Sequence, residues 1–124
     1  MYHRTEIIGN VGRDPESRFT AEGKQVTSFS VAVNVGYGDN KSTAWYRVEA
    51  WEKLAETCAK YVKKGMKVFV EGGLKFDKET GGPRIWESSG VSKASFELRA
   101  YSVRFLSKVE YEQETLDDVD DVFA

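Results

Sequence analysis

The chain has 124 residues and a mass of 14.0 kDa, which suits one domain, because each of two separate cores would hold only about 60 residues and be marginally stable. Its 40% hydrophobic and 31% charged residues exclude collagen-like, low-complexity and wholly disordered classes, and its single Cys and single His exclude a zinc site, an iron–sulfur cluster and a disulfide. The formal net charge of −2 divides into +5 over residues 1–108, with 18 Lys and Arg against 13 Asp and Glu, and −7 over residues 109–124, with seven acids and no base.

Short strands interrupted by one helix are predicted along the chain. Gln25–Val35 alternates apolar with small or polar residues, the period of a half-buried strand. Glu52–Lys64 has helical spacing instead, with Gly65 as the expected stop. The expected strands are, in order, Thr5–Val11, Gln25–Val35, Ala44–Trp51, Met66–Glu71 and Phe96–Leu106.

The stretch between the fourth and fifth strands, residues 74–95, is rich in loop-forming residues. Its two turn signals are GGP at residues 81–83 and SSG at 88–90, which predict an extended hairpin arm. The element order is three strands, a helix and two strands. This order fits an all-β fold: a five-stranded Greek-key barrel of the oligonucleotide-binding (OB) type, with one short helix between strands three and four.

The uneven charge predicts two parts: a basic OB domain over residues 1–108 and an acidic, disordered tail over residues 109–124. A basic body suits a polyanionic ligand. The tail either competes for the basic surface, recruits a partner, or only keeps the protein soluble. No apolar run approaches the roughly 20 residues of a membrane span, and no apolar signal core follows Met1, so we expect a cytoplasmic protein with no membrane partner.

The third strand carries the candidate binding face. Period-two geometry places Trp45, Arg47, Glu49 and Trp51 on one face, and the alternate residues on the other. If the first set faces water, the indoles suit stacking with unpaired bases and the guanidinium suits phosphate. The alternative is that the indoles lie in the core, which would also bury the charges of Arg47 and Glu49.

Further aromatic and basic residues interleave in the predicted loops, as a groove for a single strand requires. The aromatic ones are Tyr37, Phe76 and Trp86. The basic ones that we select as phosphate contacts are Lys41, Lys75 and Arg84, and for each single lysine the alternative is a solvated surface residue.

Several motifs occur together along the chain. They are GNVGRDPE at residues 9–16 followed by Arg18-Phe19, WYRV at 45–48 followed by WEKLAE at 51–56, YVKKG at 61–65, and VEG at 70–72. Their combination resembles the bacterial-type single-stranded-DNA-binding proteins over nearly the whole chain. The resemblance implies an OB fold, a homotetramer, and binding of single-stranded DNA without sequence preference in replication, recombination and repair, in a bacterial nucleoid or a phage-infected cell.

The resemblance also implies roles for single residues. The family's base-stacking aromatic residues correspond to Tyr37, Trp45 and Trp51. Its contacts with the DNA backbone correspond to Arg18, Arg47, Lys53 and Lys64. A family Trp beyond the fourth strand aligns with Trp86 after about eight extra residues, 76–83, with Phe76 as the alternative.

The acidic tail resembles the family's partner-binding tail, through which replication and repair proteins are recruited. The residues concerned are Asp117, Asp118, Asp120, Asp121, Val122 and Phe123. Family tails usually end in Pro-Phe, whereas the last residues of this sequence are Val122-Phe123-Ala124. We therefore expect weak binding by partners that recognise a terminal Phe together with its carboxylate.

Two other classes of function are the alternatives. An enzyme is not expected, because Cys58 lies on the apolar stripe of the helix and His3 has no evident nucleophilic partner. An OB-fold scaffold that binds protein first and nucleic acid weakly fits the tail equally well. The residues themselves also suit single-stranded RNA, so the preference for DNA comes from the resemblance alone.

Overall fold

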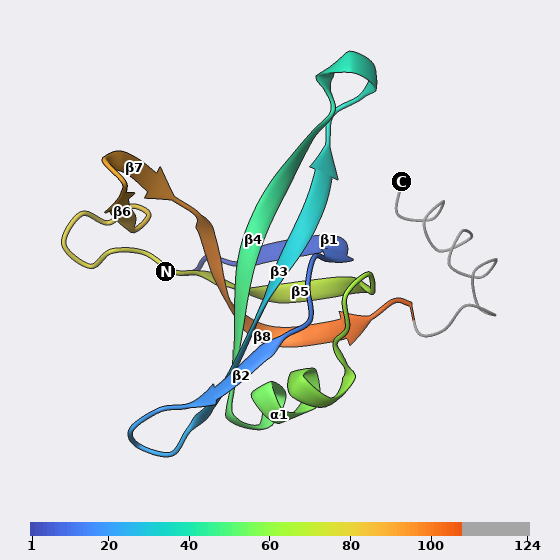
Figure 1. Cartoon of the computed structure of the whole chain (residues 1–124), viewed down its shortest axis with the longest axis vertical. Helices are drawn as coiled ribbons and strands as arrows, with labels where there is room; N and C mark the ends of the chain where they lie inside the picture. Colours follow the sequence, from blue (N-terminus) through green and yellow to red (C-terminus); the bar gives the residue numbers. More distant parts are fainter. Residues whose placement is uncertain (108–124) are drawn as a thin grey trace.

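The structure is a computed structural model that describes residues 1–107 (Figure 1). The predicted boundary at residue 108 and the predicted tail residues, Asp117 to Phe123, lie outside this range. The strands are β1 (Thr5–Val11), β2 (Glu16–Phe19), β3 (Gln25–Val35), β4 (Ser42–Trp51), β5 (Lys67–Leu74), β6 (Ile85–Ser88), β7 (Val91–Ala94) and β8 (Phe96–Phe105). A 3-10 turn η1 (Gly38–Asn40) and an α-helix α1 (Glu52–Tyr61) complete the set.

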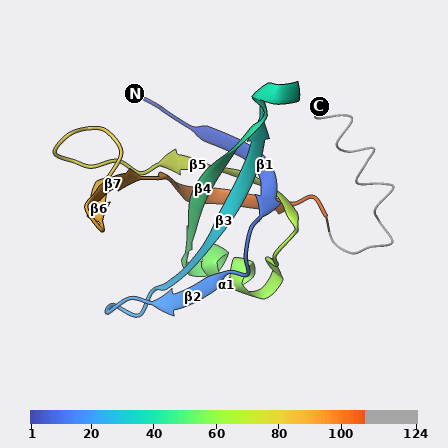
Figure 2. The same ribbon diagram turned by 45° about the horizontal axis from the view of Figure 1, so that its top comes forward.

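Five strands close into a barrel. The sheet order is β1-β5-β8-β4-β3-β2, and a further pairing of β1 with β3 joins the two sides. Strand β4 pairs antiparallel with β3 along its whole length and parallel with β8. Helix α1 lies beneath the barrel, between β4 and β5 in the chain (Figures 1 and 2). The predicted all-β OB barrel is therefore confirmed.

Aliphatic side chains from alternate strand positions fill the barrel, and the helix covers one end of it. Ala55 and Cys58 of α1 are fully buried in this core. Thr27 is buried too, and its hydroxyl donates a 2.7 Å hydrogen bond to the Ala55 carbonyl, which ties β3 to the helix. The core strand residues include Ile7, Val31, Val48, Val68, Val70 and Leu98.

Strand β4 begins two residues before its predicted start, at Ser42, and β5 ends three residues after its predicted end, at Leu74. Two other elements differ from the prediction as well. Strand β2 was not predicted, because its four residues are all exposed and carry no burial pattern; its pairing with β3 defines it. The helix ends at Tyr61 instead of Lys64, since Val62 is already extended. The N–H of Gly65 donates to the Val11 carbonyl at 2.8 Å, so a contact with β1 holds the chain after the helix.

The predicted arm is a separate two-stranded hairpin. Strands β6 and β7 pair antiparallel with their tip at Ser89 and Gly90, as expected, and lie beside the barrel (Figure 1). The loop that precedes them closes on itself: Asp77 N–H donates to the Gly82 carbonyl and Gly81 N–H to the Asp77 carbonyl, both at 2.8 Å. No helix within residues 1–107 is long and apolar enough to cross a membrane.

Barrel closure requires a glycine where β1 crosses β3. A Cβ at Gly9 would lie 2.3 Å from the Ala32 carbonyl oxygen and 2.8 Å from a Val31 methyl, closer than such atoms can approach. The next residues, Asn10 and Val11, form the β1–β3 pairing. The first glycine of the GNVG motif therefore has a structural role at the seam of the barrel.

We predict that Gly9→Ala lowers the free energy of unfolding by about 1–3 kcal/mol, because the methyl group forces β1 away from β3. The matched control is Gly82→Ala: its Cβ would meet only the Thr80 hydroxyl at 3.8 Å, so a change within about 0.5 kcal/mol is expected. Urea unfolding measures both. Equal effects of the two substitutions would contradict the packing argument.

Candidate nucleic-acid interface

Strand β4 places its aromatic and charged residues outside the barrel. Val48 and Ala50 have no exposed surface, whereas Trp45 is 53% exposed and Arg47 is exposed. Tyr46 packs against the core and stacks on Phe96 with ring centroids 5.2 Å apart. The predicted outward orientation is confirmed for Trp45 and Arg47, whereas Glu49 is buried and Trp51 only partly exposed, and the alternative that buries the Trp45 indole is wrong.

The Trp45 indole lies directly against the chain that leaves β1. A Cβ at Gly12 would come within 2.5 Å of the Trp45 Cζ3 atom, so any larger residue at this position would have to displace the ring. The N–H of Gly12 donates to the Ser30 carbonyl at 2.9 Å, which fixes this segment beside β3. The second glycine of the GNVG motif thus supports the ring, a role that the sequence analysis missed.

Trp45 shares an open pocket of about 260 Å³ with Trp86 of the arm. The pocket is lined by Ser30, Trp45, Tyr46, Arg47, Arg84, Trp86, Ser95 and Glu97. The Arg84 guanidinium carbon lies 4.7 Å from the centre of the Trp86 ring. Phe76, which is 57% exposed, does not line this pocket. Of the two aromatics proposed for this position, the structure brings Trp86 next to Trp45.

Trp51, at the other end of β4, has different surroundings. It is only partly exposed, and the Arg99 guanidinium carbon lies 4.9 Å from its ring centre. Its indole Nε1 is buried and has no hydrogen-bond partner within residues 1–107. Trp51 is therefore more closely packed into the barrel than Trp45, and Arg99 is a neighbouring cation that the sequence analysis did not select.

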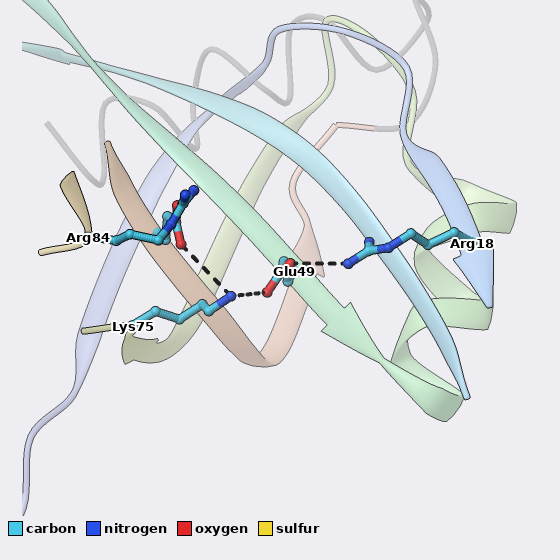
Figure 3. A network of polar contacts seen from close by, with 5 residues as sticks. Arg18, Glu49, Lys75 and Arg84 are labelled. Atoms are coloured by element: carbon cyan, nitrogen blue, oxygen red, sulfur yellow. Dashed lines mark hydrogen bonds and ion pairs between the residues drawn. The ribbon is translucent and has the colours of Figure 1, made fainter. Parts of the chain in front are cut away.

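Two carboxylates lie among the cations of this face, at Glu49 on β4 and Glu97 on β8 (Figure 3). Both residues are less than a tenth exposed. Lys75 Nζ lies 2.8 Å from a Glu49 oxygen and 3.8 Å from a Glu97 oxygen. Arg84 contacts Glu97 at 2.7 Å, and Arg18 contacts Glu49 at 3.8 Å. We call these five residues the carboxylate network.

The network changes the interpretation of three predicted phosphate contacts. Arg18, Lys75 and Arg84 are all ion-paired within the protein. Arg47, in contrast, is exposed, and its guanidinium, unlike its backbone in β4, has no hydrogen bond or ion pair with any residue of 1–107. Glu97 was missed in the sequence, and Glu49 was placed on the outer face without a partner.

The other predicted contacts lie apart from the pocket. Tyr37 is 88% exposed and, with Lys41, flanks η1 at the far tip of the β3–β4 hairpin (Figure 1). Lys53 is exposed in the first turn of α1. Lys64 is exposed between α1 and β5, where its N–H donates to the Asp14 carboxylate at 3.0 Å. The structure brings none of these four into the lining of the pocket.

Comparison with known proteins agrees with this architecture. Residues 2–106 match the single-strand binding protein family. The chain belongs to that family. Single-stranded DNA-binding protein 1 of Chlorobaculum tepidum is 40% identical over 88 residues, which are 64% of this chain and 54% of that protein.

Other relatives align over a longer stretch. The single-stranded DNA-binding proteins of Xanthomonas campestris and Neisseria meningitidis are 34% and 31% identical over 105 residues. These residues are 81% of this chain and 58% and 57% of those proteins. This member of the single-strand binding protein family therefore spans a little over half the length of the curated relatives it matches.

In this member of the single-strand binding protein family, the thiol considered as a nucleophile is enclosed by the core. Cys58 has no exposed surface, and burial raises the pKa of its thiol to about 12, because the thiolate would lose its hydration. No group of three or more His, Cys, Asp or Glu among residues 1–107 could hold a metal ion.

We predict that the folded protein does not react with an aromatic disulfide reagent at pH 8 and that unfolding in urea releases one reactive thiol. The free energy of unfolding should fall as pH rises from about 9 towards 12, because the unfolded chain loses the thiol proton while the folded chain keeps it. Cys58→Ala should remove this part of the pH dependence. Rapid reaction of the folded protein would contradict the prediction.

Proposed function

We propose that this chain binds and protects single-stranded DNA without sequence preference, by stacking bases on aromatic rings and pairing phosphates with Lys and Arg. The observation that carries the proposal is the half-exposed Trp45 indole, which shares a pocket with Trp86 and with Arg47. Stacking uses the π-face that every base has, so such a site discriminates little between sequences. The names of the relatives support DNA as the ligand.

An unpaired strand suits this face better than a duplex does. In a duplex the base faces are covered by their neighbours, whereas a single strand can turn a base out onto an indole. Trp45 and the Arg47 guanidinium, which no group within residues 1–107 pairs, would then hold adjacent parts of one nucleotide, the base and the phosphate.

The biological role that we propose follows from family membership. Protection of exposed single strands belongs to replication, recombination and repair in the bacterial cytoplasm. The acidic tail would recruit partner proteins or compete with DNA for the basic face, and residues Asp117 to Phe123 would carry that role. The alternative is a scaffold that binds protein first and nucleic acid weakly.

A homotetramer is part of the same proposal. Strand β1 pairs with β5 over Thr5–Asn10 but with β3 only at Asn10 and Val11. Within residues 1–107, the other edge of Thr5–Gly9 therefore has no partner strand. A free edge of this kind can pair with the same edge of a second copy about a two-fold axis.

Sedimentation equilibrium tests the assembly: we expect a species of four chains at micromolar concentration. Replacing Ile8 by Pro should favour smaller species, because Pro at the middle of the free edge removes an N–H donor. Circular dichroism should show that the variant folds. A monomer in the unsubstituted protein would overturn the tetramer and leave the DNA-binding proposal in place.

Tryptophan fluorescence tests the function. Titration with an oligo-dT should quench the emission strongly, and Trp45→Ala should weaken binding by about 1–3 kcal/mol through loss of one stacked base. Trp45→Phe, which keeps a ring, should recover part of the loss. Urea unfolding checks that each variant is folded.

The outcome also separates the alternatives. Unchanged fluorescence with no retention of oligo-dT would favour the protein-binding scaffold. Equal affinity for an oligo-U of the same length would show that the ligand class is single-stranded nucleic acid in general.

A further inference from the structure

The two glutamates of the carboxylate network occupy an unusual position for a surface that binds a polyanion. Glu49 and Glu97 are 8% and 9% exposed, on neighbouring strands β4 and β8 of the same outer face. Glu97 also lines the pocket that contains Trp45 and Trp86. Two carboxylates therefore lie within the surface that is proposed to receive phosphates.

The cations of the network cover these carboxylates. Arg18 comes from β2, whereas Lys75 and Arg84 come from the two ends of the loop between β5 and β6, so two segments that are distant in the sequence meet here (Figure 3). Their side chains are between 44% and 57% exposed, whereas both glutamate side chains are 10% exposed. The positive groups thus face water and the negative groups lie beneath them.

This layering reduces the charge that an approaching strand encounters. Three cations and two carboxylates give the network a formal charge of +1, against +3 for the cations alone. Removal of a carboxylate from water is unfavourable unless a cation accompanies it. The two glutamates are fixed in strands. They therefore stay ion-paired with Arg18, Lys75 and Arg84 until another anion replaces them.

We propose that Glu49 and Glu97 act as internal competitors of phosphate: in the free protein they occupy the cations that DNA phosphates take over in the complex. Binding at this part of the face is then an exchange of ion pairs, in contrast to neutralisation at Arg47, whose guanidinium is not paired by any described residue. This inference rests on the proposed function and assigns two residues that set its affinity and its sensitivity to salt.

The physical consequence is a weaker salt dependence than the number of cations suggests. Each phosphate neutralised by a free cation steepens the plot of log affinity against log salt by about 0.7 for single strands. A cation that is already paired benefits less from meeting a phosphate, because it must weaken its contact with a carboxylate. The network therefore reduces both affinity and slope.

The test uses Glu49→Gln and Glu97→Gln, singly, in the full chain. Gln keeps the size and a hydrogen-bond acceptor but removes the negative charge. Affinity for an oligo-dT is measured over a range of NaCl concentrations. Each variant should bind several-fold more tightly than the unsubstituted protein at low salt, with a slope steeper by up to about 0.7 for each additional phosphate that its cations neutralise.

The matched control is Glu71→Gln. Glu71 lies on β5, its side chain is 13% exposed, and it is ion-paired with Arg4, which is not part of the pocket or of the network. The Glu71→Gln substitution changes the net charge of the chain by the same amount as Glu49→Gln or Glu97→Gln does. A control that matches the affinity and slope of the two network variants would overturn the proposal, because the effect would then arise from overall charge.

The alternative role for these carboxylates is to clamp the arm and β2 onto the barrel. In that case the Gln variants would bind more weakly, or with an unchanged slope, and either result would overturn the proposal. Failure of the unsubstituted protein to bind oligo-dT at all would remove the proposed function, and with it the exchange, so the two failures are distinguishable.

A second measurement needs no variant. A structure of the unsubstituted protein with oligo-dT should show phosphate oxygens on Arg18, Lys75 or Arg84 and longer distances from these cations to Glu49 and Glu97. Retention of every ion pair of the network, with no phosphate on any of its cations, would overturn the proposal.

Discussion

The outer face of this protein depends on the fixed register of strand β4. Hydrogen bonds hold β4 on both edges, to β3 from Val35 to Val26 and to β8 beside Tyr46–Glu49. A slip of one residue would exchange the two faces of the strand. It would put Arg47 and Glu49 into a core made of aliphatic side chains, and the cost of burying these charges excludes it. The same constraint therefore keeps the core apolar and presents the Trp45 indole to water.

The positive charge of this face depends on the buried carboxylates beneath its cations as much as on the number of those cations. Glu49 lies on the same face of β4 as the exposed Arg47. It is nevertheless buried, because the side chains of Arg18 and Lys75 cover it. The ion pairs also connect β2 and the arm to the barrel, since Arg84 reaches Glu97 from the arm. A basic formal charge over residues 1–108 is thus an incomplete measure of the positive surface, because part of that charge is already compensated inside the face.

Much of the barrel could be predicted because it depends on local patterns. Alternation predicted the faces of β4, and the order of strands and helix predicted the OB barrel. Strand β2 could not be predicted, since its exposed residues lack a period. The carboxylate network was not predicted for a different reason. Lys75 lies 26 residues from Glu49 in the sequence, and the pairing of β8 with both β4 and β5 is what brings the two side chains together. Trp86 was already favoured over Phe76 from the sequence, and the structure adds that Trp86, and not Phe76, shares a pocket with Trp45.

The loop of residues 76–83, which precedes Trp86, closes on itself. Asp77 accepts from Gly81 and donates to Gly82, so the loop begins and ends at nearly one place. Its two flanking residues, Lys75 and Arg84, both approach the Glu97 carboxylate. The backbone N–H of Lys75 also donates to the Glu97 carbonyl at 2.8 Å. A loop whose two ends are anchored at one residue leaves the position of the following strand to that anchor, so the contacts with Glu97 place Trp86 in the pocket with Trp45.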